Sequence, residues 1–144
     1  MLIGEYRHTI DAKKRIAIPV KFRKELGARA VLTRGLDACL FLYPLSVWET
    51  IAAKLGELPM GQAGTRGFVR LLLSGAHEVD LDKLGRILVP EHLRTAAGLE
   101  KQVVLTGVFN RVEIWDAKAW DAYRAKSEAN AAENAERLGE IGAF

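Results

Sequence analysis

The sequence has little of what disulfide-rich, membrane-bound or thiol-dependent proteins carry. Cys39 is the one cysteine among 144 residues, which excludes an intrachain disulfide framework. Apolar residues follow it in Cys39-Leu-Phe-Leu-Tyr43, so we expect a small buried core residue, with a catalytic thiol as the alternative. The chain reaches charged residues by Glu5, and no apolar run approaches the roughly 18 to 20 residues that span a bilayer. We therefore expect no signal peptide, no membrane anchor and a cytoplasmic location.

Signals of catalysis are also scarce. The glycines of residues 61–67 are not followed by the GK[ST] of a phosphate loop, and no nucleophile elbow is present. The best candidate for an enzymatic site is the acidic run of residues 78–82. Glu78, Asp80 and Asp82 alternate along a strand, so they share one face and could bind a cation there. His77 has the opposite parity, and no other histidine or cysteine lies near at ligand spacing. We expect a solvated strand face there, no enzyme, no cofactor, no metal and no small-molecule substrate.

Positive charge is concentrated at the start of the chain, although the formal net charge is only +3. Residues 1–35 hold nine Lys or Arg against three Asp or Glu, a net of +6, whereas residues 36–115 carry −1 and residues 116–144 carry −2. A basic N-terminal third favours a polyanion such as nucleic acid as partner, and a solvated basic face is the plainer alternative. The 49% of hydrophobic residues suffice for one core, made by one domain or by two small halves.

One stretch of the sequence occurs twice. IDAKKRIAIPVKFR at residues 10–23 returns as LDKLGRILVPEHLR at residues 81–94. Two repeats are too few for a solenoid, so we expect two pseudo-twofold halves that bury their apolar faces against each other. At a spacing of 71 residues, seven of 24 aligned positions are identical, namely Gly4/Gly75, Asp11/Asp82, Arg15/Arg86, Ile16/Ile87, Pro19/Pro90, Arg23/Arg94 and Gly27/Gly98.

Each half has the same expected order of elements. Residues 5–10 and 15–18 are expected to form strands on either side of a turn at residues 11–14. Pro19 ends the second strand and suits the first turn of a short helix over residues 19–26, with a copy at residues 90–97. Hairpins follow, with strands at residues 30–33 and 40–43 in the first half and at residues 102–106 and 112–115 in the second.

Helices are expected between and after the halves. A stripe of apolar residues at helical spacing predicts a helix after Pro44, and a loop is expected at residues 58–67. Residues 68–73 are expected to form a second helix rather than a buried strand. An acidic, alanine-rich helix is expected at residues 116–138, docked at its start through Trp120 and Tyr123. We predict a first half at residues 1–50, a helical linker at 51–74, a second half at 75–120, and a C-terminal helix and tail at 121–144.

An aspartate and an arginine four residues apart bracket the turn in each repeat. Asp11 can accept backbone N–H groups of its own turn, and Arg15 can pair with it or project outward. With Lys13 and Lys14 beside it, Arg15 would lie at a cationic loop tip, where its planar fork matches phosphate or guanine. A hairpin turn tied by one ion pair is the plainer alternative.

The duplicated pattern resembles the MraZ family of cytoplasmic bacterial regulators, which are built from two SpoVT–AbrB-type halves. The resemblance implies a mainly β fold with α: a swapped-hairpin (double-split) β-barrel of two pseudo-twofold repeats, plus linker helices and a C-terminal helix. It covers the whole chain and is carried by Asp11-x-x-x-Arg15, Asp82-x-x-x-Arg86, the strand and proline after each, Phe22-Arg23, Leu93-Arg94, Gly4 and Gly75-Ala-His77.

The same resemblance implies a function. It implies a homo-oligomeric ring, associated with the nucleoid, that binds short direct repeats of double-stranded DNA in the promoter of its own division and cell-wall gene cluster and usually represses it. An alternative within the same fold is an antitoxin-like, oligomeric module that binds a protein partner without reading DNA. Its interface would then include residues 68–73 and the helix of Trp48.

Residue by residue, the resemblance makes Arg15 and Arg86 the DNA-contacting arginines and gives Asp11 and Asp82 the shaping of their loops. The lysines of the loops, Lys13, Lys14 and Lys83, complete the expected DNA-binding set.

The chain departs from the family pattern at Lys14, because the family usually has glycine before the first arginine, as this chain does at Gly85. If the turn needs a positive φ there, Lys14 is strained. If it does not, Lys14 simply adds a phosphate contact, which is the alternative that we favour.

Overall fold

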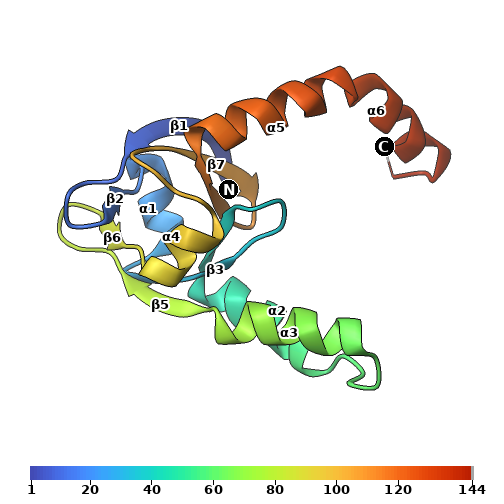
Figure 1. Cartoon of the computed structure of the whole chain (residues 1–144), viewed down its shortest axis with the longest axis horizontal. Coiled ribbons are helices and arrows are strands. Elements are labelled where there is room, and N and C mark those ends of the chain that lie inside the picture. The colour runs from blue at the N-terminus through green and yellow to red at the C-terminus, as the bar shows by residue number, and fades with distance from the viewer. Residues whose placement is uncertain (144) are drawn as a thin grey trace.

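The protein contains two copies of one arrangement of strands and helices (Figure 1). The computed structural model describes residues 1–143, so Phe144 of the predicted tail lies outside it. The first half comprises β1 (Leu2–Thr9), β2 (Arg15–Ala17), α1 (Val20–Leu26), β3 (Arg29–Arg34), β4 (Leu40–Pro44), α2 (Leu45–Gly56) and α3 (Ala63–Ser74). The second half comprises β5 (His77–Asp80), β6 (Arg86–Leu88), α4 (Glu91–Ala96), β7 (Gln102–Phe109), β8 (Val112–Asp116), α5 (Ala117–Ala129) and α6 (Ala131–Glu140).

The strand order shows how the two halves are joined. Six antiparallel strands run in the order β1-β7-β8-β4-β3-β5, and exchanging equivalent strands of the two halves turns this order into its own reverse. The halves are therefore related by a pseudo-twofold axis, as the repeat predicts. The first strand of each half pairs with the third strand of the other: β1 lies along β7, and β5 lies along β3.

A second, two-stranded sheet is formed by β2 and β6, which we call the ribbon. Its central pair is Ile16 and Ile87, which are equivalent residues of the two repeats. An isolated β-bridge joins Ile16 of the ribbon to Ile10, the residue that directly follows β1. The mixed β and α architecture is thus as predicted, whereas this strand pairing gives a sheet and a ribbon and does not show a closed barrel.

The main hydrophobic core lies between the halves. Proline at 19 and at 90 precedes α1 and α4, because its fixed φ suits the start of a helix and it lacks the N–H of a continuing strand. Each short helix then buries one large side chain, Phe22 or Leu93, completely. Both join the ribbon residues Ile16 and Ile87 in the core, so neither half has a core of its own.

The helices after the halves differ from the prediction in two places. The helix expected at residues 68–73 exists, but α3 begins at Ala63, so part of the expected loop is helical. The single helix expected at residues 116–138 is two helices, because the chain turns at Asn130. There the Asn130 amide donates to the carbonyl of Lys126 at 3.1 Å, a local bond of the kind by which asparagine competes with helix continuation.

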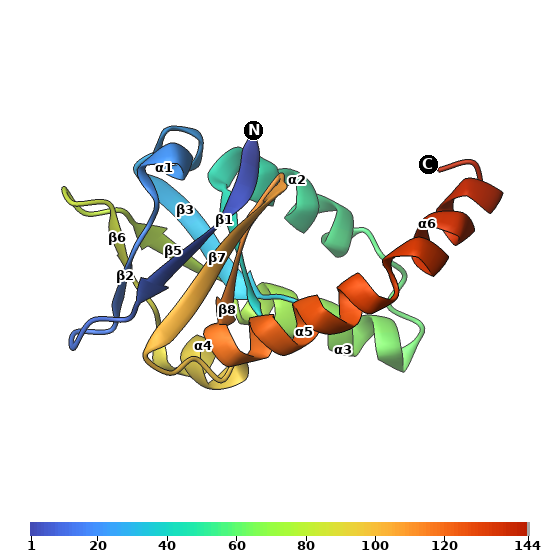
Figure 2. The same ribbon diagram turned by 90° about the horizontal axis from the view of Figure 1, so that it is seen from above.

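The helical segments and the ribbon lie at opposite ends of the molecule. In Figures 1 and 2 the loops before β2 and β6 project at the left, while α2, α3 and α6 extend to the right. The first turns of α5 are docked as predicted, with Trp120 and Tyr123 packed on Trp115 at ring-centroid distances of 5.4 and 4.9 Å. Among residues 1–143, no helix is both long and apolar enough to cross a membrane.

Candidate nucleic-acid interface

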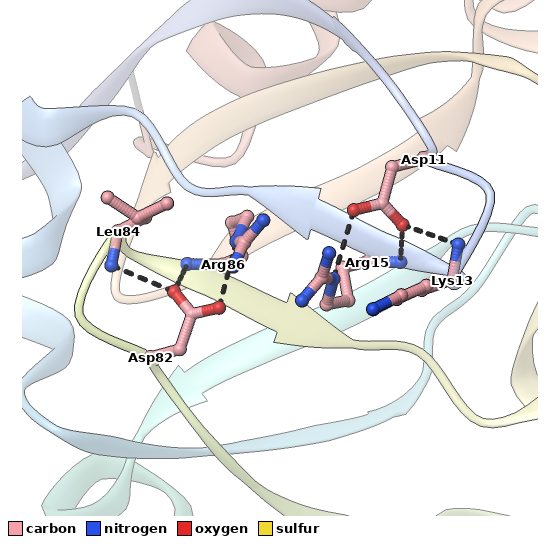
Figure 3. Close-up of polar contacts among 6 residues, drawn as sticks. All are labelled: Asp11, Lys13, Arg15, Asp82, Leu84 and Arg86. Atoms are coloured by element: carbon pink, nitrogen blue, oxygen red, sulfur yellow. Dashed lines mark hydrogen bonds and ion pairs between the residues drawn. The ribbon is translucent and has the colours of Figure 1, made fainter.

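Asp11 organises the first motif loop, which we define as residues 11–15. Its Oδ1 accepts the N–H groups of Lys13 and Arg15, each at 2.9 Å, and its Oδ2 accepts Nε of Arg15 at 3.0 Å (Figure 3). The backbone closes the same loop, since N–H of Asp11 donates to the carbonyl of Arg15 and N–H of Lys14 to the carbonyl of Asp11. One carboxylate therefore fixes both the turn and the start of the arginine side chain.

Asp82 repeats this arrangement in the second motif loop, residues 82–86. Its Oδ1 accepts the N–H groups of Leu84 and Arg86 at 2.9 Å, and its Oδ2 accepts Nε of Arg86 at 2.8 Å (Figure 3). In both loops these bonds hold the pKa of the aspartate below its ordinary value, with the arginine N–H as the largest cause and the guanidinium also contributing. Both aspartates are thus held as acceptors at neutral pH.

The ribbon presents the two arginines on one face. Ile16 and Ile87 point inward and are fully buried, so by strand alternation their neighbours Arg15, Ala17, Arg86 and Leu88 point outward. Arg15 pairs with Leu88 and Ala17 with Arg86, which makes the two arginines diagonal neighbours, a spacing of roughly 7–8 Å in such ladders. Each arginine side chain is 28% exposed.

Each arginine keeps most of its donors for a partner. Within residues 1–143, its only hydrogen bond from the guanidinium is that of Nε to the aspartate, which leaves Nη1 and Nη2 available. Such a partly exposed ion pair adds little to stability. Its effect is to orient the planar fork, whose remaining two nitrogens match phosphate oxygens or the O6 and N7 of guanine.

The turn does require a positive φ before the arginine. Gly85 has φ of +75° and Lys14 has φ of +66°. A residue with a side chain is strained in this left-handed region. Lys14 is therefore strained, and the favoured expectation of an unstrained Lys14 that only adds a phosphate contact is wrong. Lys14 is also exposed, as are Lys13 and Lys83, so all three expected lysines lie at the loop tips with accessible side chains.

Two further arginines, for which the sequence predicted no role, support the segments that hold the motif loop of the other half. Arg23 donates from Nε to the carbonyl of Ile18 at 2.7 Å and lies against Gly85, while N–H of Ile18 donates to the carbonyl of Gly85. Arg94 donates from Nη1 to the carbonyl of Val89, whose N–H donates to the carbonyl of Lys14 in the first motif loop. Both arginines are identical positions of the repeat, and that is the signal that could have marked them.

The carboxylates of residues 78–82, the possible cation site of an enzyme, form ion pairs and hydrogen bonds with neighbouring residues. Arg29 Nε donates to Asp80 Oδ1 at 2.8 Å, its Nη1 reaches Glu78 at 3.4 Å, and Asp82 caps its own loop. In the described part of the chain, no three histidine, cysteine, aspartate or glutamate side chains are grouped to hold a metal ion. Cys39 is 3% exposed as expected, and burial raises the pKa of its thiol to about 12.

The fold and these loops define a class of protein: a duplicated α and β chain whose halves present two equivalent, aspartate-shaped arginine loops on one ribbon. A family described as "MraZ protein, putative antitoxin-like" matches the chain twice, at residues 1–71 and 72–140. The chain belongs to the MraZ family.

Curated relatives cover almost the full length of the chain. "Transcriptional regulator MraZ" of Thermoanaerobacter pseudethanolicus is 51% identical over 141 residues, which is 98% of this chain and 99% of the relative. Proteins of the same name in Acetivibrio thermocellus and Limosilactobacillus reuteri are 48% and 50% identical, and the alignments cover 99% and 96% of this chain and 99% and 97% of the relatives. Membership places the chain in a family of transcriptional regulators, rather than of enzymes.

Proposed function

We propose that this protein binds double-stranded DNA sequence-specifically, at short direct repeats in the promoter of its own division and cell-wall gene cluster, and represses transcription there, in the cytoplasm at the nucleoid. The observation that carries the proposal is the outward face of the ribbon. There an aspartate fixes the direction of each arginine fork, and Nη1 and Nη2 of Arg15 and Arg86 have no hydrogen-bond partner among residues 1–143.

The shape of the ribbon supports groove reading. The major groove of B-DNA admits a two-stranded β-ribbon, and arginine bonded to O6 and N7 of guanine is the commonest specific contact there. Leu88 lies opposite Arg15, is 58% exposed and could contact a thymine methyl group. The ribbon's central pair of Ile16 and Ile87 lies on the pseudo-twofold axis, so the two arginines would approach neighbouring base pairs in related orientations.

The lysines of the loops supply phosphate contacts in this proposal. Lys13 and Lys14 flank Arg15 in the first loop, whereas Lys83 is the one lysine of the second. Phosphate contacts position a protein on DNA without reading sequence, and each one makes binding more sensitive to salt. We expect the first loop to contribute more affinity than the second, because it carries the denser cluster of cations.

The assembly of the chain into a ring is part of the proposal. The helical end opposite the ribbon exposes Phe68 and Leu71 on α3, beside an apolar hollow of about 190 Å³ that Trp48, Ile51 and Phe68 help to line. A ring would present several ribbons to repeated half-sites and would gain affinity by effective concentration when their spacing matches.

We also infer that the sheet and the ribbon correspond to a swapped-hairpin barrel, and that the predicted four-part division of the chain describes its domains.

The proposal is tested with DNA from upstream of the protein's own coding sequence. Arg15→Ala should abolish specific binding, measured by fluorescence anisotropy against a scrambled fragment, while light scattering shows the wild-type assembly. Arg137→Ala removes the same charge from α6 at the other end and should bind like the wild type. Wild-type affinity in the Arg15 variant would refute the assignment.

The antitoxin-like function is the second hypothesis, and the exposed apolar side chains of α3 favour it. Under this hypothesis the helical end binds a protein partner and the basic loops have no role in binding. The two are separated by the absorbance of the purified protein at 260 nm. A DNA-binding protein retains nucleic acid that high salt removes, whereas protein that is free of nucleic acid at low salt favours the partner-binding module.

A further inference from the structure

The two motif loops differ in how the arginine of the neighbouring short helix, Arg23 or Arg94, packs against them. At the second loop, Arg23 packs so closely on Gly85 that a Cβ there would lie 2.1 Å from its Nε. At the first loop the equivalent residue is Lys14, which carries a real Cβ at nearly the same φ. The equivalent arginine, Arg94, cannot lie in the same way against that backbone, and it reaches the carbonyl of Val89 through Nη1 rather than Nε.

The chain segment behind the first loop is also longer. Gly27 directly precedes Ala28, whose carbonyl accepts N–H of Leu81. In the other half, Leu99 and Glu100 are inserted between Gly98 and Lys101, whose carbonyl accepts N–H of Ile10. The two inserted residues therefore lie beside the first loop, and Lys101 occupies the position that Ala28 has in the other half.

These two differences leave a hollow of about 590 Å³ beside the first loop. It is lined by residues of both halves, with Asp11, Lys14, Arg94, Glu100 and Lys101 as its ionisable groups. Asp11 accepts three hydrogen bonds, from the N–H groups of Lys13 and Arg15 and from Nε of Arg15, and the guanidinium of Arg15 balances its charge. The remaining lining is three cations against Glu100, which is exposed.

We propose that this hollow is a phosphoryl-binding site, in which Lys14, Arg94 and Lys101 hold a phosphate of the DNA backbone next to the groove occupied by the ribbon. Three cations around a space open to solvent suit a phosphate. Asp11 and Lys14 of the lining belong to the same loop as Arg15, the arginine that would enter the groove. Lys101 and Arg94 are thereby DNA-contacting residues contributed by the second half to the first loop. The DNA source of the phosphate rests on the function proposed above.

The experiment compares Lys101→Gln with Lys126→Gln, which removes the same charge from an exposed position on α5. Each phosphate contact contributes about 0.9 to the slope of log affinity against log salt concentration. Lys101→Gln should lower this slope by about 0.9 on both upstream and scrambled DNA, and Lys126→Gln should leave it unchanged. Glu100→Gln should strengthen binding, because it removes the one uncompensated anion.

A second arm separates the sources of the phosphate. Inorganic pyrophosphate is titrated without DNA and followed through the amide resonances of residues 99–101 in wild type and in Lys101→Gln. Saturable shifts that vanish in the variant, with no change of salt slope, assign the site to a free phosphorylated ligand. An unchanged slope together with no pyrophosphate binding overturns the proposal. If the wild type shows no preference for its upstream DNA, the proposed function fails, while pyrophosphate binding still decides the site.

Discussion

Lys14→Gly should make the protein more stable and its DNA binding weaker. Lys14 has φ of +66°, and the left-handed region costs a residue with a side chain roughly 1–2 kcal/mol. Glycine removes that strain but loses more backbone entropy on folding, about 0.5–1 kcal/mol. The net stabilisation is therefore about 0.5–1 kcal/mol, which for a chain of this size raises Tm by roughly 1–4 °C.

Lys13→Gly is the matched control, because it removes the same charge from the adjacent position. Lys13 is not among the described residues of positive φ, so this glycine brings the entropy cost without relief of strain. It should lower the free energy of unfolding by about 0.5–1 kcal/mol. Urea unfolding at one protein concentration measures both variants. A Lys14→Gly protein that unfolds at lower urea than the wild type, or together with Lys13→Gly, would refute the reasoning about strain.

Three further predictions concern the loops and the core. Gly85→Ala should destabilise by about 1–3 kcal/mol in urea unfolding, because its Cβ displaces Arg23 from the carbonyl of Ile18 and adds left-handed strain; unchanged stability would contradict the brace. The pKa values of Asp11 and Asp82 are lowered in the folded protein, so their ionised forms stabilise the loops at any pH above the ordinary aspartate pKa. This stabilisation is lost as the pH falls through the lowered pKa. The amide resonances of the loops should therefore broaden or shift below about pH 4 and stay constant from about pH 5 to 8. The raised pKa of Cys39 keeps it a buried thiol at neutral pH, so a thiol reagent should modify it only as fast as the protein unfolds.

The repeat predicted more of the fold than any local pattern did. Pro19 and Pro90 predicted the starts of two helices within a residue. The strands expected at residues 5–10 and 15–18 exist, but the first begins earlier, at Leu2, and ends at Thr9. The identity of Ile16 and Ile87 in the repeat is explained by their pairing in the ribbon, but that pairing depends on how the halves exchange strands. Nothing in the pattern of one half specifies which strand of the other it joins.

The candidate site was predictable in its residues and less so in its geometry. The four-residue spacing of Asp11 and Arg15 correctly suggested a turn whose aspartate accepts backbone N–H groups. The conformation of Lys14 could not be chosen from sequence, because a tertiary hydrogen bond from the N–H of Val89 to the carbonyl of Lys14 helps to hold the loop. The carbonyls to which Arg23 and Arg94 donate belong to Ile18 and Val89, whose N–H groups reach the motif loop of the other half, and no local pattern specifies that contact. The break at Asn130 is marked by a local hydrogen bond that competes with helix continuation.

Arg15→Lys tests the central claim, that the fork of Arg15 reads sequence rather than only attracting phosphate. Lysine keeps the charge and loses the planar pair of donors, and a bidentate arginine–guanine contact discriminates by about 1–3 kcal/mol. The measurement is the ratio of affinities for upstream and scrambled DNA at one salt concentration. We predict that this ratio falls by roughly 5- to 150-fold while the salt dependence on scrambled DNA is unchanged. An unaltered ratio would contradict the account.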